Sequence, residues 1–182
     1  AHQLSESAIR AETAYAGLSR KELSEKAAAT QNIIGGTVYE ANRAVHNIEI
    51  PDSGDAERLA RASDATKFVN GTGKNPFKDL SRDRLDLIIY DDSGRYTVNE
   101  RRAASGEVGR QEYEWRKTVV AKAQDEYNRT GKLTHFFSDI LEHYKSLPTI
   151  EQAQYPDAYE GQLEQLIELD YNYLTNKVEG KG

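Results

Sequence analysis

The chain has 182 residues, of which 37% are hydrophobic and 30% are charged, and it contains no cysteine. The lack of cysteine excludes disulfide bonds, a cysteine nucleophile and cysteine-ligated metals, and no apolar run approaches the length of a transmembrane helix. The net charge is −6, and residues 139–182 hold nine acidic but three basic side chains, so we expect no binding of nucleic acid, because an acidic surface repels phosphates.

Apolar residues recur at helical spacing along most of the chain, and the strict alternation typical of strands is nearly absent. The spacing and the intervening turn residues predict helices over residues 8–18, 20–34, 38–46, 55–69, 81–90, 98–128, 134–144 and 157–176. An extended segment is an alternative for the third of these, because Ile48 and Ile50 alternate before Pro51. We therefore expect an all-α fold, a multi-helix bundle of about six to eight helices in a single domain over 1–182.

The longest predicted helix, 98–128, is expected to be the central one. Its apolar residues share one helical face; they are Trp115, Val119, Val120, Ala123 and Tyr127. The last predicted helix has a similar apolar face, and we expect Asp170 at the edge of it.

Four pairs of residues fit the reciprocal capping box that begins many helices. In this motif a hydroxyl before the first turn accepts a backbone N–H, and an acid or amide three residues later accepts another in return. The pairs are Ser19 with Glu22, Thr37 with Glu40, Thr97 with Glu100, and Thr149 with Gln152. Their recurrence supports the all-α prediction.

A turn rich in oxygen-bearing side chains separates the predicted helices 81–90 and 98–128. Asp91 and Ser93 precede the bend at Gly94, Arg95 offers its backbone carbonyl, and Glu100 follows. Residues 81–110 resemble the helix-loop-helix of the EF-hand family, whose loop places oxygens at the third, fifth and seventh positions, a glycine at the sixth and a bidentate glutamate at the twelfth. The resemblance implies a calcium site formed by Asp91, Ser93, Arg95 and Glu100.

The match departs from the family at the first loop position. That position is Ile89, which has no side-chain oxygen, and Asp92 falls at the fourth position, which is not a ligand. The alternative is a favourable turn followed by a capped helix, in which Thr97 and Glu100 satisfy backbone N–H groups. The sequence leaves both readings open.

A second group of ligand-type side chains lies on the predicted helix 134–144. His135, Asp139 and His143 follow each other at steps of four, so they project from one side of the helix. Imidazole and carboxylate are common metal ligands, but the two histidines lie about 12 Å apart along the axis, too far to share one ion. We expect these residues to form a solvated polar face.

These observations favour a non-catalytic helical module that binds or regulates another protein and carries one calcium-binding loop. Residue 1 is alanine and the chain lacks methionine and cysteine, from which we expect a part of a larger protein, bacterial and either exported or surface-associated. One alternative is an enzyme whose site is assembled from separate helices, with His135, Asp139 and His143 as candidates. The other is an interaction scaffold without a ligand.

Overall fold

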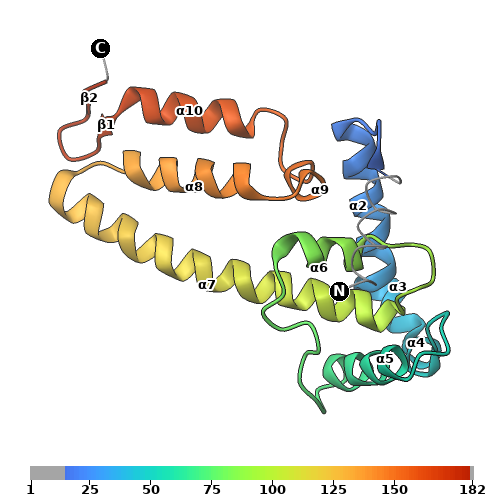
Figure 1. Ribbon diagram of the computed structural model, residues 1–182. Coiled ribbons are helices and arrows are strands. Elements are labelled where there is room, and N and C mark those ends of the chain that lie inside the picture. Colours follow the sequence, from blue (N-terminus) through green and yellow to red (C-terminus); the bar gives the residue numbers. More distant parts are fainter. Residues whose placement is uncertain (1–14, 181–182) are drawn as a thin grey trace. The chain divides into compact units, whose positions relative to one another are not determined.

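The computed structural model describes residues 15–180, whose regular secondary structure is almost all helical (Figure 1). The all-α prediction is confirmed, and so is the single long helix, α7 (Val98–Thr130). The contacts within the chain divide it into two compact units. Unit 1 comprises Ala1–Arg110 with Pro148–Ile150, and unit 2 comprises Gln111–Leu147 with Glu151–Gly182. The expectation of one domain over 1–182 stays a prediction.

Unit 1 contains five helices of its own within the described residues and the first part of α7. They are α2 (Arg20–Ile34), α3 (Gly36–Ala41), α4 (Arg43–Ile48), α5 (Ala56–Val69) and α6 (Arg82–Ile89). Three of them confirm the predicted helices 20–34, 55–69 and 81–90 to within a residue at each end. The predicted helix 8–18 lies mostly outside the described residues.

The starts of α2 and α3 show which of the predicted capping boxes form. Ser19 and Glu22 form the expected capping box before α2, with both hydrogen bonds at 3.1 Å. The box predicted for Thr37 and Glu40 is wrong, because α3 begins one residue before Thr37 with Gly35 as its N-cap. Gly36 has φ +67°, a left-handed conformation that favours glycine, so the chain turns and the helix restarts earlier than predicted.

The predicted helix 38–46 is in fact two short helices, α3 and α4. The break is at Asn42, whose side chain donates to the carbonyl of Val38 rather than capping α4. An asparagine that bonds its own preceding turn competes with the continuous helical pattern.

The first turns of α7 supply several of the buried polar side chains of unit 1. Asn99 and Glu100 are fully buried, and the expected capping box is present, with Thr97 N–H donating to Glu100 and Glu100 N–H donating to Thr97. Arg101 donates to the carbonyl of Ile89 at 2.7 Å. Hydrogen bonds rather than apolar contacts alone therefore fix the start of α7.

Unit 2 consists of the second part of α7, two further helices and a two-stranded hairpin. The helices are α8 (Thr134–Ser146) and α10 (Tyr159–Leu169), and the strands are β1 (Tyr171–Asn172) and β2 (Lys177–Val178). Figure 1 shows α8 and α10 side by side and antiparallel. The short helix α9 (Thr149–Gln152) crosses the division between the units, and Thr149 is its first residue rather than the residue before it.

The predicted helix 157–176 is wrong in its last part, because α10 ends at Leu169. Asp170 adopts a left-handed conformation, with φ 44°. Its carboxylate accepts from Thr134 Oγ1 at 2.6 Å and from Lys132 Nζ at 2.9 Å. Asp170 therefore ends the helix by bonding the start of α8, and the strands pair antiparallel beyond it, with Tyr171 opposite Val178.

None of the helices between residues 15 and 180 is both long and apolar enough to cross a membrane.

Candidate functional site

Side chains of α7 contact α8 along one line in unit 2, and we call this line the α7–α8 seam. The indole of Trp115 stacks on the imidazole of His143, with ring centroids 3.7 Å apart and planes 10° from parallel. Lys122 pairs with Asp139 at 3.3 Å. At the far end, the carboxylate of Glu126 accepts the backbone N–H groups of His135 and Phe136 at 2.9 and 3.0 Å.

The contact made by Glu126 supplies a helix cap that the local sequence lacks. The N-cap residue of α8 is Leu133, which has no side chain able to accept a hydrogen bond. A carboxylate at the start of a helix satisfies free N–H groups and interacts favourably with the positive end of the helix dipole. Glu126 is itself buried, so the start of α8 is fixed by a residue of α7.

His143 is held from two sides, by a ring and by a carboxylate. Its Nε2 lies 2.6 Å from Glu112 Oε1, and both side chains are 17% exposed. An ionised Glu112 carboxylate can only accept, which assigns the donor role in this hydrogen bond to the imidazole. The bond and the stack on Trp115 fix the orientation of the imidazole at the seam.

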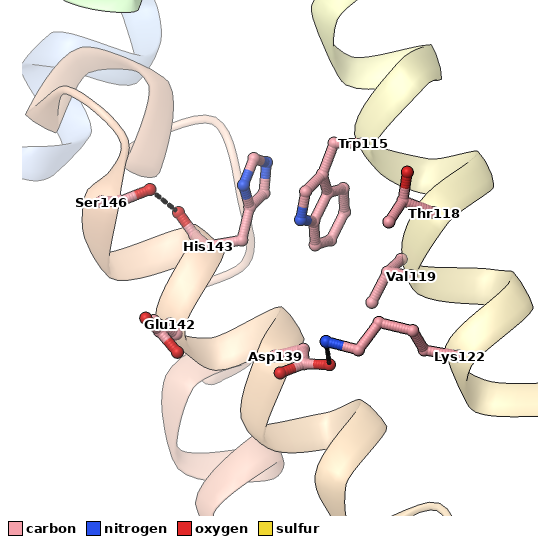
Figure 2. A pocket seen from close by; sticks show the side chains of 8 residues that line it. All are labelled: Trp115, Thr118, Val119, Lys122, Asp139, Glu142, His143 and Ser146. Atoms are coloured by element: carbon pink, nitrogen blue, oxygen red, sulfur yellow. Dashed lines mark hydrogen bonds and ion pairs between the residues drawn. The ribbon is translucent and has the colours of Figure 1, made fainter. Parts of the chain in front are cut away.

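A pocket of about 390 Å³ opens on one side of the seam, and Figure 2 shows its lining. We call it the polar pocket. Trp115 and His143 form one end, and the Lys122–Asp139 ion pair forms the other (Figure 2). Ser146 donates to the backbone carbonyl of His143 at 2.6 Å. The Ser146 hydroxyl and the two charged groups of the ion pair therefore already have partners within the protein (Figure 2).

A second pocket, of about 370 Å³, opens beside the same stack, and we call it the aromatic pocket. Its aromatic lining consists of Trp115, Phe136, His143, Tyr144, Tyr155 and Tyr159, and aliphatic side chains of α7 and α8 complete it. The three tyrosine rings contact each other with centroids 4.8 to 5.4 Å apart. Offset and edge-on contacts at these distances are favourable for aromatic rings, so they form a preorganised wall.

One carboxylate and one guanidinium also line the aromatic pocket. Glu112 is largely buried, whereas Arg116, one turn further along α7, is exposed. Burial raises the pKa of the Tyr159 hydroxyl above its ordinary value of 10.0, and the charge of Glu112 raises it further. Of the two, Glu112 is therefore the more buried charged side chain of the lining and Arg116 the more exposed one.

The residues of the predicted calcium site are brought together only in part. Asp91 Oδ1 accepts from the backbone N–H of Ser93 at 2.9 Å and from its hydroxyl at 2.5 Å. Gly94 has φ +85°, the left-handed conformation that this turn needs. Asp92 pairs instead with Lys26 at 3.1 Å.

The other two predicted ligands contact arginines of α5. The backbone carbonyl of Arg95 accepts from Arg58 at 3.0 Å, and Glu100 accepts from Arg61 Nε at 2.9 Å. Both oxygens of Glu100 are thus engaged, one by Arg61 and one by the N–H of Thr97. Calcium would reach Glu100 only after the Arg61 pair had opened, and the calcium site stays a prediction.

The histidine and aspartate residues of α8 do not meet at one point. His135 is exposed, as a solvated polar face requires, but His143 is not, because the indole of Trp115 covers it. Asp139 lines the polar pocket with His143. Within residues 15–180, no group of three or more histidine, aspartate, glutamate or cysteine side chains is placed to hold a metal ion.

Sequence reasoning missed the residue that links these features. Glu112 looks like any carboxylate of an acidic helix, because its partner His143 is 31 positions away. A weak local signal exists, since Glu112, Trp115 and Val119 share one face of α7 at helical spacing. Comparison of the chain with protein-family models, with curated proteins and with solved structures found no match.

Proposed function

We propose that the chain is a non-catalytic helical binding module, part of a larger protein, and that its ligand site is the aromatic pocket of unit 2. The observation that supports this proposal is the incomplete filling of the α7–α8 seam. Two open pockets flank a single aromatic stack, and ligands bind preferentially in concave, largely apolar pockets of this kind. The lack of cysteine and methionine is what favours a bacterial, exported or surface-associated parent protein.

The chemistry of the lining fits a binding site. Ligand sites are concave and largely apolar, with a few polar groups that fix orientation. The aromatic pocket has that character, with six aromatic side chains and the Glu112 carboxylate. Aromatic residues are also over-represented at protein interfaces, where they supply much of the binding energy. A protein partner is therefore the proposed ligand.

The proposal is tested by selecting binders from a display library of random 12-residue peptides against the immobilised protein. Selected peptides are then titrated while the fluorescence of Trp115, the one tryptophan of the chain, is recorded. We expect saturable changes in emission, because Trp115 lines the pocket. Failure to recover any peptide that changes Trp115 emission would overturn the proposal.

A matched pair of variants locates the binding. Val120 and Val38 are both 51% exposed, on α7 of unit 2 and α3 of unit 1 respectively. Val120→Tyr fills the aromatic pocket, which Val120 lines, and is expected to abolish peptide binding. Val38→Tyr makes the same change away from the pocket and is expected to leave binding unaltered. Equal binding by the two variants would place the site elsewhere.

One observation favours a second candidate function, an enzyme with its site assembled from two helices. His143 of α8 and Glu112 of α7 converge at the pockets, and an imidazole oriented by a carboxylate is the usual arrangement of a general base. The test is the hydrolysis of p-nitrophenyl acetate by wild type and His143→Gln. Turnover that the variant loses would support the enzyme, and equal background rates would leave the binding module.

A further inference from the structure

The lining of the aromatic pocket includes the Glu112 carboxylate, and this charged group indicates which kind of side chain the pocket binds. We propose that it receives a cationic side chain, lysine or arginine, from a partner peptide. This inference rests on the proposed binding function and names its ligand class.

The central observation is a carboxylate set among aromatic rings. Glu112 lines the pocket together with Trp115, Tyr155 and Tyr159, and its side chain is 17% exposed. A cation is attracted to the negative face of an aromatic ring, and a nearby carboxylate adds direct charge attraction. The two effects act together on a positively charged group and neither favours a neutral one.

The net charge of unit 2 also favours a positively charged partner. Residues 111–147 and 151–182 hold thirteen acidic and eight basic side chains, a net charge of −5. Such an excess steers positively charged partners toward the surface. Arg116, the one arginine of the pocket lining, is exposed and so more strongly screened by salt than the largely buried Glu112.

The shape of the pocket suits a long side chain rather than a compact ion. Aliphatic side chains of α7 and α8, Val120 and Ile140 among them, line the walls beside the rings. Lysine and arginine pack their methylene stems on apolar surface while the charged head stays with polar groups. The stem would lie against Val120 and Ile140, with the head toward Glu112 and the tyrosine wall.

The test compares a charged peptide with its neutral copy. The probes are acetyl-Leu-Lys-Leu-amide and the same peptide with norleucine, which keeps the stem of lysine without its charge. Binding is followed in 150 mM salt through the indole N–H signal of Trp115 in a ¹H–¹⁵N spectrum, a single peak because the chain has one tryptophan. We expect the lysine peptide to bind on the order of tenfold more tightly.

Two variants separate the pocket from the general charge of the unit. Glu112→Gln removes the charge while its amide oxygen can still accept from His143. Glu114→Gln removes one charge two residues away, where the side chain is 54% exposed and pairs with Lys117. We expect Glu112→Gln to weaken the lysine peptide roughly tenfold and Glu114→Gln to leave its affinity unchanged.

Each other outcome overturns a stated part of the inference. Equal losses in the two variants would mean that the general charge of the unit attracts the peptide, not the pocket. Norleucine binding as tightly as lysine, and blocked by Val120→Tyr, would make the pocket apolar in preference and leave the binding function standing. If neither tripeptide binds although display has yielded peptides that depend on the pocket, the cation inference alone is wrong. Melting temperatures of both variants check that each is folded.

Discussion

The indole of Trp115 and the imidazole of His143 lie face to face, 3.7 Å apart, and join α7 to α8 between two pockets. The Glu112 carboxylate also holds the imidazole, through a hydrogen bond to its Nε2. This arrangement makes Trp115 both a wall of the aromatic pocket and a contact that holds unit 2 together. Changes at Trp115 are therefore expected to affect stability as well as binding.

Trp115→Ala should lower the free energy of unfolding by about 1–3 kcal/mol. The value lies below that for a fully buried tryptophan, because Trp115 is half-buried. Urea denaturation followed by circular dichroism measures it. Tyr113→Ala, on the same helix but 58% exposed, is the control and should stay within about 0.5 kcal/mol of wild type. Equal effects of the two changes would show that the stack adds nothing to stability.

The buried Asn99 joins α7 to α3, α4 and α5 of unit 1. Its side-chain oxygen accepts from the Tyr39 hydroxyl at 2.6 Å, and its amide donates to Thr66 Oγ1 at 3.1 Å and to the carbonyl of His46 at 3.2 Å. Asn99→Leu leaves the fully buried Tyr39 hydroxyl without its acceptor and should cost about 3 kcal/mol.

A double-mutant cycle isolates the bond between these two residues. Tyr39→Phe removes the hydroxyl that Asn99→Leu would leave without an acceptor, so the double variant should recover about 1 kcal/mol relative to the sum of the single changes. Chemical denaturation of the four proteins gives the coupling. A coupling of zero would mean that the hydrogen bond does not stabilise unit 1.

The titration of Glu100 should contribute to the pH dependence of the free energy of unfolding. Burial raises the pKa of this carboxyl above its ordinary value of 4.5, against the opposing effects of Thr97 and Arg61. A raised pKa means that the folded state holds the proton more tightly than the unfolded state does. The resulting stabilisation is complete below pH 4.5 and is lost as the pH rises through the folded-state pKa.

Glu100→Gln should remove this dependence, because glutamine resembles the protonated acid at every pH. We expect wild type and variant to have similar stabilities near pH 4, and wild type to lose stability relative to the variant as the pH approaches 7. Thermal melts across that range measure the difference. A constant difference between the two proteins would show that Glu100 does not titrate as its burial predicts.

Calcium binding by residues 91–100 also depends on Glu100, which must leave Arg61 to reach the ion. With Ile89 at the first loop position, we expect an affinity no better than about 10⁻⁴–10⁻³ M. Calorimetry and melts in millimolar calcium or chelator test it, with Glu100→Gln as the variant that chelates poorly. A wild type that shows neither heat nor a shift in melting temperature would leave the loop as a capped turn.

Glu126→Ala should destabilise unit 2 by about 1–2 kcal/mol, because two N–H groups at the start of α8 lose their acceptor. Asp125→Ala is the control, since that side chain is 64% exposed and pairs with Arg129 on the surface. Surface pairs of this kind contribute less than about 1 kcal/mol. Equal losses in the two variants would contradict the capping role.

The parts of the fold that were predicted correctly depend on nearby residues. Ser19 and Glu22, like Thr97 and Glu100, are three positions apart, and each pair forms its box as the motif implies. The end of the last helix could not be foreseen in this way. Asp170 stops it by bonding Thr134, 36 positions earlier, and no local pattern contains that contact.

The candidate site could not be predicted from the sequence, because its contacts also join residues that are far apart in the chain. Trp115 was correctly placed on the apolar face of α7, and the stack on His143 unites it with a residue 28 positions later. Glu100 was recognised as an important residue, but its partner Arg61 comes from α5, 39 positions before. Sequence patterns identify side chains that are able to bind or react, whereas the packing of the helices decides which of them come into contact.

The cap that Glu126 provides also has a consequence for the order in which unit 2 folds. Glu126 contacts residues nine and ten positions later, so closing this loop costs little chain entropy and takes about 10–100 ns. The acceptor is synthesised before the helix that it starts, and α8 can begin as soon as its first turn has left the ribosome. The Glu126 cap can therefore form before the residues that follow α8 are made, whereas the bonds from Thr134 and Lys132 to Asp170 form only later.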